Sequence, residues 1–278
     1  MSDLASLINA VEQADSSAQL IEAVRRLAAT GHAEAVPTLI TVLSYNNPGA
    51  AVAAVDGLVK IGEPAVAPLL EQLDQHNYTA RSWAIRALAG IGDPRGFVTL
   101  LGVATADFSL SVRRAAARGI GAMKWHWFPE HLLEIAQEEA MEALLFVAQQ
   151  DEEWVVRYAA VVGLESLACD FTFSHPEWRS HIEATFAHLA IADESWAVRA
   201  RVWKAQQHLQ GSAAAVAACQ PQANQVEDEP SPLSPHDWQD ILDKLYERKR
   251  QERVTLPEGD PRRYRELVGT VTHNAGEL

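Results

Sequence analysis

Cysteine is nearly absent from this chain of 278 residues, which contains only Cys169 and Cys219. Two cysteines so far apart supply neither a disulfide framework nor the short ligand spacing of a zinc site. Long apolar stretches are also missing: no run reaches the roughly 18 residues of a membrane-spanning helix, and no charged-then-apolar leader opens the sequence. We therefore expect no metal centre, no membrane insertion and a cytoplasmic location.

Basic residues are in the minority, with 23 Lys and Arg against 37 Asp and Glu, which gives a formal net charge of −14. Nonspecific binding to nucleic acid depends on Lys and Arg that neutralise phosphates, so this balance argues against a nucleic-acid partner. A local cluster of Arg113, Arg114 and Arg118 still leaves room for a small anionic ligand.

Apolar residues make up 48% of the chain and recur with a helical period. Ala84, Ala87, Leu88 and Ile91 stand at i, i+3, i+4 and i+7, on one face of a helix that Gly92 closes. The same stripe returns four more times, at spacings of 30 to 44 residues. Its second position is small each time, which indicates that another helix crosses closely there: Gly57, Ala87, Gly119, Gly163 and Ala205. This pattern predicts an all-α fold, an α-solenoid of HEAT-like repeats with two helices per unit.

Three units also begin with the same pair of charges, an Asp followed six residues later by an Arg. The pairs are Asp107 with Arg113, Asp151 with Arg157, and Asp193 with Arg199. In a stacked array, an Asp in the turn can pair with an Arg at the start of the next helix, and such pairing lets charges tolerate partial burial. We interpret Arg157 and Arg199 as parts of a structural ladder.

The composition divides the chain into three parts. Residues 1–211 carry the repeats and form the predicted solenoid. Residues 212–235 are rich in proline and acidic residues and read as a flexible linker. Residues 236–278 form a C-terminal extension, in which 236–253 have one apolar stripe and a capping signal at Ser234 and Asp237, so they predict an amphipathic helix that docks on the solenoid or on a partner.

Two features inside the repeats admit two readings each. Asp56 stands within an otherwise apolar helix, where a carboxylate is a surface or ladder group or a functional one. The segment from Trp125 to Phe128 inserts three large aromatic residues into a lengthened repeat. These aromatics form either a plug that seals the repeat or a surface for a ligand or partner.

Three strings of residues carry a resemblance to a known family. They are NNPGAAVAAVDGLVKIG (46–62), NYTARSWAIRALAGIGDPR (77–95) and DFSLSVRRAAARGIG (107–121), and WVVRYAAVVGLESL (154–167) adds to them. Over residues 10–210 the chain resembles the phycobilin lyases with HEAT-like repeats, and among them the F-type (beta) subunits of the heterodimeric phycocyanobilin lyase.

The resemblance implies a subunit that acts with an E-type partner to attach phycocyanobilin, an open-chain tetrapyrrole, to a cysteine of the apo-phycocyanin alpha chain. The bilin is then a bound substrate, and the protein needs no cofactor of its own. Such a site requires a carboxylate near the pyrrole nitrogens, cations for two propionates, and rings that pack on the bilin. On chemistry we assign Asp56 to the first role. The other candidates are Arg86, Arg113, Arg114 and Arg118 for the propionates, and Tyr78, Trp83 and Trp125 for ring packing.

Isomerising relatives carry a His-Cys pair where this chain has His76 and Asn77, so we expect transfer without double-bond isomerisation. A second hypothesis remains open. A HEAT array most often presents surfaces for binding, and a non-catalytic scaffold or bilin chaperone for phycobilisome assembly or degradation would have the same fold.

Overall fold

The computed structural model describes residues 4–73, 77–170, 175–218 and 233–255, and every regular element in these ranges is helical. The chain divides into two units, Met1–Pro232 and Leu233–Leu278. The predicted all-α fold is therefore confirmed. None of the helices described is both long and apolar enough to cross a bilayer.

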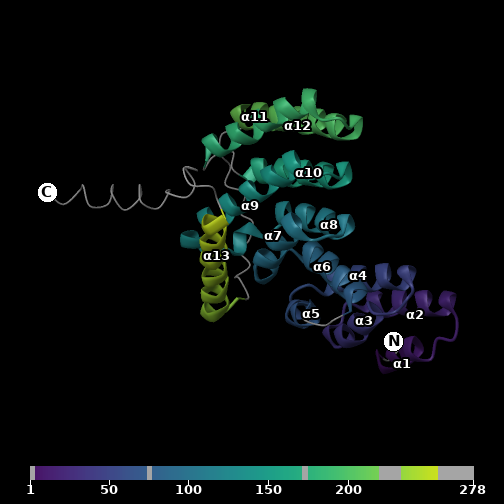
Figure 1. Cartoon of the computed structure of the whole chain (residues 1–278). Coiled ribbons are helices and arrows are strands. Elements are labelled where there is room, and N and C mark those ends of the chain that lie inside the picture. Colours follow the sequence, from purple (N-terminus) through teal and green to yellow (C-terminus); the bar gives the residue numbers. More distant parts are fainter. Residues whose placement is uncertain (1–3, 74–76, 171–174, 219–232, 256–278) are drawn as a thin grey trace. The chain divides into compact units, whose positions relative to one another are not determined.

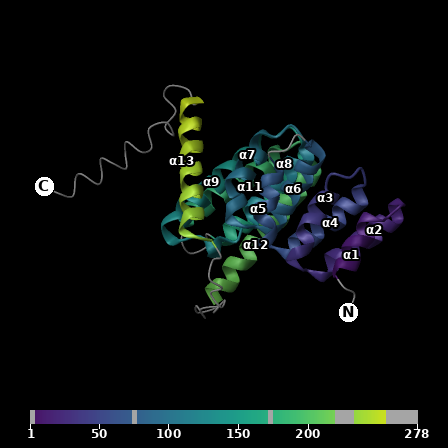
Figure 2. The same cartoon turned by 90° about the horizontal axis from the view of Figure 1, so that it is seen from below.

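The first unit is built from two layers of α-helices that alternate along the chain. The odd-numbered layer consists of α1 (Leu4–Glu12), α3 (Val36–Val42), α5 (Val66–Leu73), α7 (Phe97–Ala106), α9 (Glu130–Gln150) and α11 (Pro176–Ala192). The even-numbered layer consists of α2 (Ser17–Thr30), α4 (Pro48–Ile61), α6 (Tyr78–Ile91), α8 (Leu110–Gly121), α10 (Trp154–Asp170) and α12 (Trp196–Ala218). Each even-numbered helix contacts the next one in its layer, an order that can be followed in Figure 1. Figure 2 gives the view from below, in which successive repeats overlap. This is the predicted solenoid.

Short sequence signals set the helix ends. The side chains of Asn47 and Asn77 accept hydrogen bonds from the backbone N–H groups of Ala50 and Ala80, and so cap α4 and α6. Gly92 ends α6 with a φ of 68°, a left-handed conformation that favours glycine. Asp93 then caps the 3₁₀ helix Pro94–Gly96, which leads into α7. These caps reproduce the helix–turn–helix unit expected from the sequence.

The small-residue column marks the places where even-numbered helices touch. A Cβ atom added to Gly57 would lie 2.6 Å from Cβ of Ala28, and one added to Gly119 would lie 2.5 Å from Cβ of Ala89. At Gly163 the nearest atom would be the backbone oxygen of Ala117, at 2.7 Å. Real Cβ atoms do not approach so closely, so the close crossing inferred from the sequence is confirmed at these three positions.

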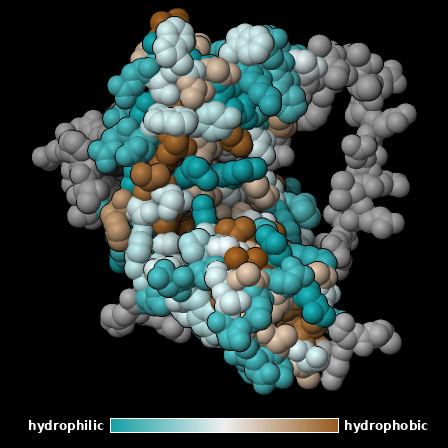
Figure 3. Space-filling view, turned by 90° about the vertical axis from the view of Figure 1, so that its right-hand side faces the viewer, coloured by the Kyte–Doolittle hydropathy of each residue, from teal (hydrophilic) through white to brown (hydrophobic). Residues whose placement is uncertain are grey.

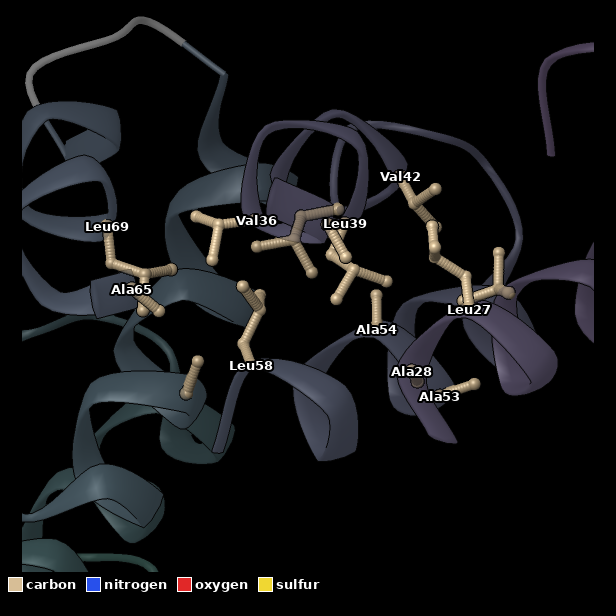
Figure 4. Close-up of a cluster of buried hydrophobic side chains, with 14 of the residues drawn as sticks. Leu27, Ala28, Val36, Leu39, Val42, Ala53, Ala54, Leu58, Ala65 and Leu69 are labelled. Atoms are coloured by element: carbon tan, nitrogen blue, oxygen red, sulfur yellow. The ribbon is translucent and has the colours of Figure 1, made fainter. Parts of the chain in front are cut away.

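Aliphatic side chains from both layers fill the space between them. In the N-terminal half, Leu27, Leu39, Leu58 and Leu69 are completely buried and come from four successive helices (Figure 4). Burial of one such side chain contributes about 1.5–3 kcal/mol. The core is therefore continuous from one repeat to the next.

The charged ladder joins neighbouring repeats at the start of the even-numbered helices. Arg81 Nη1 lies 2.6 Å from Asp107 Oδ2, Arg113 Nε lies 2.7 Å from Asp151 Oδ2, and Arg157 Nε lies 2.8 Å from Asp193 Oδ2. Arg113 and Arg157 also donate to the backbone oxygens of Asp107 and Asp151 in their own repeats. Each of these arginines reaches forward to the aspartate of the following repeat, so Arg157 is part of a ladder between repeats. Arg199, which was also interpreted as a ladder residue, donates instead to the backbone oxygen of Asp193.

Hydrogen bonds hold the carboxylate of Asp193 in the ionised form. Burial of Asp193 opposes ionisation, but hydrogen bonds from Arg157 and from the N–H of Ser195, with the charges of Arg157 and Arg199, lower its pKa below the usual value. For Arg157 the hydrogen bond from its side chain to Asp193 outweighs burial and raises the pKa.

The second unit contains α13 (Pro235–Thr255), which begins within a residue of the predicted start. The N–H of Ser234 donates to Asp237 Oδ2 over 2.8 Å, and the N–H of Asp237 donates back to Ser234 Oγ over 3.3 Å. This is the predicted capping box. Ile241 and Leu245 of the predicted apolar stripe are four residues apart and so lie on one face of this helix. Most of the predicted linker and the segment 256–278 lie outside the described residues.

Candidate functional site

A groove of about 830 Å³ runs over α6, α8, α10 and the start of α12. This volume is typical of ligand pockets, which span about 300–1,000 Å³. Its lining combines cations, aromatic rings and small residues, namely Arg86, Ala89, Gly90, Arg114, Ala115, Arg118, Gly119, Ala122, Trp154, Val155, Tyr158, Ala159, Val162 and Ala197. The glycines and alanines in this list have little or no side chain. Much of the surface of the groove is therefore backbone and methyl groups, on which a flat molecule can lie.

Three arginines supply the positive charge of the groove. Arg86 is partly buried with its guanidinium 4.7 Å from the ring centroid of Trp83, while Arg114 and Arg118 are exposed. Among the described residues, none of the three makes an ion pair or a side-chain hydrogen bond. Burial lowers the pKa of Arg86, and the nearby positive charge of Arg114 lowers it further. The cluster is therefore suited to an anionic ligand.

Two aromatic side chains on α10 add apolar surface to the groove. Trp154 is 46% exposed and Tyr158 is 38% exposed, although both are large rings inside a packed array. The guanidinium of Arg201 on α12 lies 6.0 Å from the ring centroid of Tyr158. Arg201 is buried and pairs with Glu165, which also lies 3.0 Å from Nδ1 of His208. A polar cluster between α10 and α12 thus supports the Tyr158 side of the groove.

The predicted propionate partners divide into two groups. Arg86, Arg114 and Arg118 come together in the groove as expected. Arg113 points away into the ladder, where its Nε and Nη2 donate to both oxygens of Asp151. This guanidinium is already paired with a buried carboxylate and does not line the groove, so the structure gives no support to the predicted contact between Arg113 and a ligand.

The predicted ring-packing residues do not line the groove. Trp125 is buried against Phe97 and Phe128, with ring centroids 5.6 and 5.2 Å away, so the aromatic insertion is the plug rather than a ligand surface. Tyr78 stacks on Phe108 at 4.5 Å and its hydroxyl donates to the ladder residue Asp107. Trp83 does not line the groove, but its ring contacts the guanidinium of Arg86, which does.

Asp56 also lies outside the arginine groove. It is exposed on α4 and lines a separate hollow of about 260 Å³ together with Arg25, Gly57 and Lys60. Asp56 belongs to the same layer of even-numbered helices as the groove. However, the arginines of the groove come from α6 and α8, and α4 does not line it. This placement does not support Asp56 as the carboxylate for a ligand bound beside the arginines.

Sequence reasoning missed Trp154 and Tyr158. A signal was present, because the motif D-E-x-W-x-V-R occurs at 151–157 and again at 193–199, with Trp154 and Trp196 in the same position. Residues four apart on a helix share a face, so Trp154 predicts that Tyr158 lies beside it. Figure 3 shows apolar aliphatic residues in brown between hydrophilic residues in teal; tryptophan and tyrosine take pale colours on this scale.

Comparisons with known proteins identify the relatives of this chain. The HEAT repeats family matches residues 4–89 and 66–165. The chain is 60% identical over 274 residues, 97% of both chains, to a phycocyanobilin lyase subunit beta from Pseudanabaena tenuis. It is 45% identical over 202 residues, 72% of this chain and 97% of the relative, to a phycocyanobilin lyase subunit beta from Nostoc.

A solved structure gives the same picture. In the complex of CpcE and CpcF of phycocyanin lyase from Nostoc sp. PCC7120, one chain is 44% identical and superposes with a TM-score of 0.57. The match covers 63% of this chain and 99% of that chain. The HEAT repeats and the identity over nearly the whole length show that this chain belongs to the family of phycocyanobilin lyase beta subunits.

Proposed function

We propose that this chain is the beta subunit of a two-subunit lyase, and that with an E-type subunit it attaches phycocyanobilin to a cysteine of the phycocyanin alpha chain. The observation that carries the assignment of the site is the groove with Arg86, Arg114 and Arg118, three cations without an internal anion among the described residues. An open-chain bilin offers the complementary features, two propionates and a conjugated apolar body.

The bilin would lie along the groove with its propionates at the arginines and its rings against Trp154 and Tyr158. Arginine binds carboxylates through a planar fork of donors, which orients the ligand as well as holding it. The small residues of α6 and α8 leave space for the rings. The subunit thereby holds a flexible substrate in one conformation, which is the contribution expected of a protein that positions reactants.

The chemistry itself needs no nucleophile from this chain. The thiol of the acceptor adds across the exocyclic double bond of bilin ring A: a C–S bond forms, the thiol proton goes to the neighbouring ring carbon, and nothing is released. The lining residues of the groove include no Ser, Cys, Asp, Glu or His. A carboxylate for the pyrrole nitrogens would therefore come from the partner subunit or the acceptor, which gives a reason for two subunits.

The test is co-expression of this chain with an E-type subunit, the apo-alpha chain and phycocyanobilin. A chromophore that stays on the alpha chain after denaturation supports the lyase. Replacement of Arg114 or Arg118 by Ala should weaken bilin affinity by about tenfold, the low end for a charged hydrogen bond because both side chains are exposed. Arg25→Ala is the matched control, an exposed arginine on α2 outside the groove.

The alternative, a scaffold or chaperone without catalysis, predicts a different outcome. Bilin would bind to the groove, and the arginine variants would weaken that binding, but no denaturation-resistant chromophore would form with any E-type subunit and acceptor. Equal transfer by Arg114→Ala, Arg118→Ala and the wild type would instead show that the bilin binds elsewhere.

A further inference from the structure

The last even-numbered helix, α12, exposes a large apolar side chain at a position that is buried in the earlier even-numbered helices. This position lies four residues after each ladder arginine. In α6, α8 and α10 it is Ile85, Ala117 and Val161, each with 0% exposure. In α12 the equivalent position, four residues after Arg199, is Trp203, and it is 63% exposed.

Helical geometry places this residue away from the preceding repeat. Arg201 and His208 contact Glu165 of α10 and so mark the side of α12 that faces α10. At about 100° per residue, Trp203 lies roughly 140–160° around the helix from both. Trp196, 80% exposed and seven residues before Trp203, lies on the same side as Trp203. We call Trp196, Arg199 and Trp203 the terminal face.

The ladder is incomplete at this face. Arg113 and Arg157 each hold an aspartate of the following repeat with Nε and Nη2, and donate to their own turn with Nη1. Arg199 instead donates from Nε to the backbone oxygen of Asp193, and its guanidinium lies 4.9 Å from the ring centroid of Trp196. Within the described parts of the chain no carboxylate occupies the place that Asp151 and Asp193 fill for the earlier arginines.

A terminal repeat that only ends an array presents a polar outer face, because exposed core positions reduce solubility. This chain has two tryptophans and an arginine there, the residue types that dominate binding hot spots. Resting on the proposed function, we propose that the terminal face binds the E-type subunit, through a helical repeat of that subunit whose entrance turn supplies a carboxylate to Arg199. The ladder and the layer of even-numbered helices would then continue into the partner.

A second copy of this chain fits the face less well. Head-to-tail contact between identical chains that does not close produces open filaments, and a symmetric pair of terminal faces would place no carboxylate of these three residues beside Arg199. The net charge of −14 on each copy also opposes such stacking. A partner of different sequence avoids both problems, and the Nostoc complex joins two lyase subunits.

The test measures the dissociation constant between this chain and its E-type subunit by calorimetry, with each variant first checked by thermal unfolding. Trp203→Ala and Arg199→Glu should each weaken binding by about thirtyfold or more, as expected for hot-spot residues. Trp154→Ala is the matched control: it removes the tryptophan equivalent to Trp196 one repeat earlier, in the groove, and should leave the affinity within about threefold.

Measurements of bilin transfer distinguish a failure of the docking proposal from a failure of the proposed lyase function. Excess E-type subunit should restore transfer by Trp203→Ala, because only association is impaired, whereas it should not restore transfer by Arg118→Ala. If Trp203→Ala and Arg199→Glu bind the E-type subunit like the wild type, the terminal face is not its docking site. Loss of self-association alone in these variants would also overturn the proposal, in favour of a second copy. If the wild-type pair binds but transfers no bilin, the proposed function fails and the docking site stands.

Discussion

Removal of one carboxylate from the ladder should destabilise the solenoid by an amount that depends on how deeply the pair is buried. Asp193→Asn keeps the shape of the side chain but leaves the buried guanidinium of Arg157 without its counter-ion. The side chains of this pair are 2% and 8% exposed. Breaking a buried pair by removing one partner costs about 3–5 kcal/mol.

The surroundings of Arg157 put the expected loss at the lower end of this range. The guanidinium keeps its hydrogen bonds to the backbone oxygens of Asp151 and Glu152, and the carboxylate of Glu194 lies 3.6 Å from Nη2. We therefore expect a loss of about 3 kcal/mol, which lowers the melting temperature by roughly 6–12 °C in a domain of this size. Asp107→Asn should cost less, because its partner Arg81 is 29% exposed.

The pH dependence follows from the lowered pKa of Asp193. The folded-state pKa is below the ordinary value of 3.8, so the stabilisation is fully present above that value and is lost as the pH falls through the folded pKa. The difference between wild type and Asp193→Asn should thus be constant from about pH 6 to 8 and shrink below about pH 4. Urea unfolding at a series of pH values measures it. Equal losses for Asp193→Asn and Asp107→Asn, or a difference that grows in acid, would refute the reasoning.

Two further outcomes are expected. Gly121→Val places a branched side chain where even a Cβ would lie 2.3 Å from Cα of Gly163, so α8 and α10 must separate. Thermal unfolding should show destabilisation of at least about 1–3 kcal/mol, with Gly102→Val, on α7 in open space, as the control; equal melting of both variants would contradict the close contact. Deletion of residues 212–278 should leave bilin transfer largely intact while lowering stability or partner affinity, because 72% of this chain suffices to match 97% of the Nostoc relative. Abolished transfer with normal partner binding would place the tail in the active site.

The fold was predictable from sequence because its signals are local and repeated. The apolar stripe, the glycine closing α6 and the caps Asn47 and Asn77 act within a few residues of the chain. The ladder was predictable for the same reason, since Asp and Arg recur at fixed spacing. Repetition also indicated where helices would cross, because one column stayed small in every repeat.

The candidate site was only partly predictable because side-chain direction depends on packing between repeats. Arg113 and Arg114 are neighbours in sequence, yet the first turns toward Asp151 and the second toward the groove. Composition left open whether Trp125 is part of a plug or a ligand contact, and the packing of its ring against Phe97 on α7 and Phe128 decides for the plug. Asp56 looked exceptional within its helix, and its position on α4 became apparent only when the helices were stacked.

The contact between Gly121 and Gly163 has a consequence for how the groove takes up a ligand. Backbone meets backbone at this crossing, so the separation of α8 and α10 is set by main-chain geometry and not by rotamers. The spacing of α8 and α10 is therefore fixed before a ligand binds, so the conformational entropy lost on binding comes from the ligand and from side chains such as Arg114 and Arg118, and not from the backbone of these helices. Across a series of tetrapyrroles with the same propionates, affinity should then increase with the stiffness of the bridges between the rings.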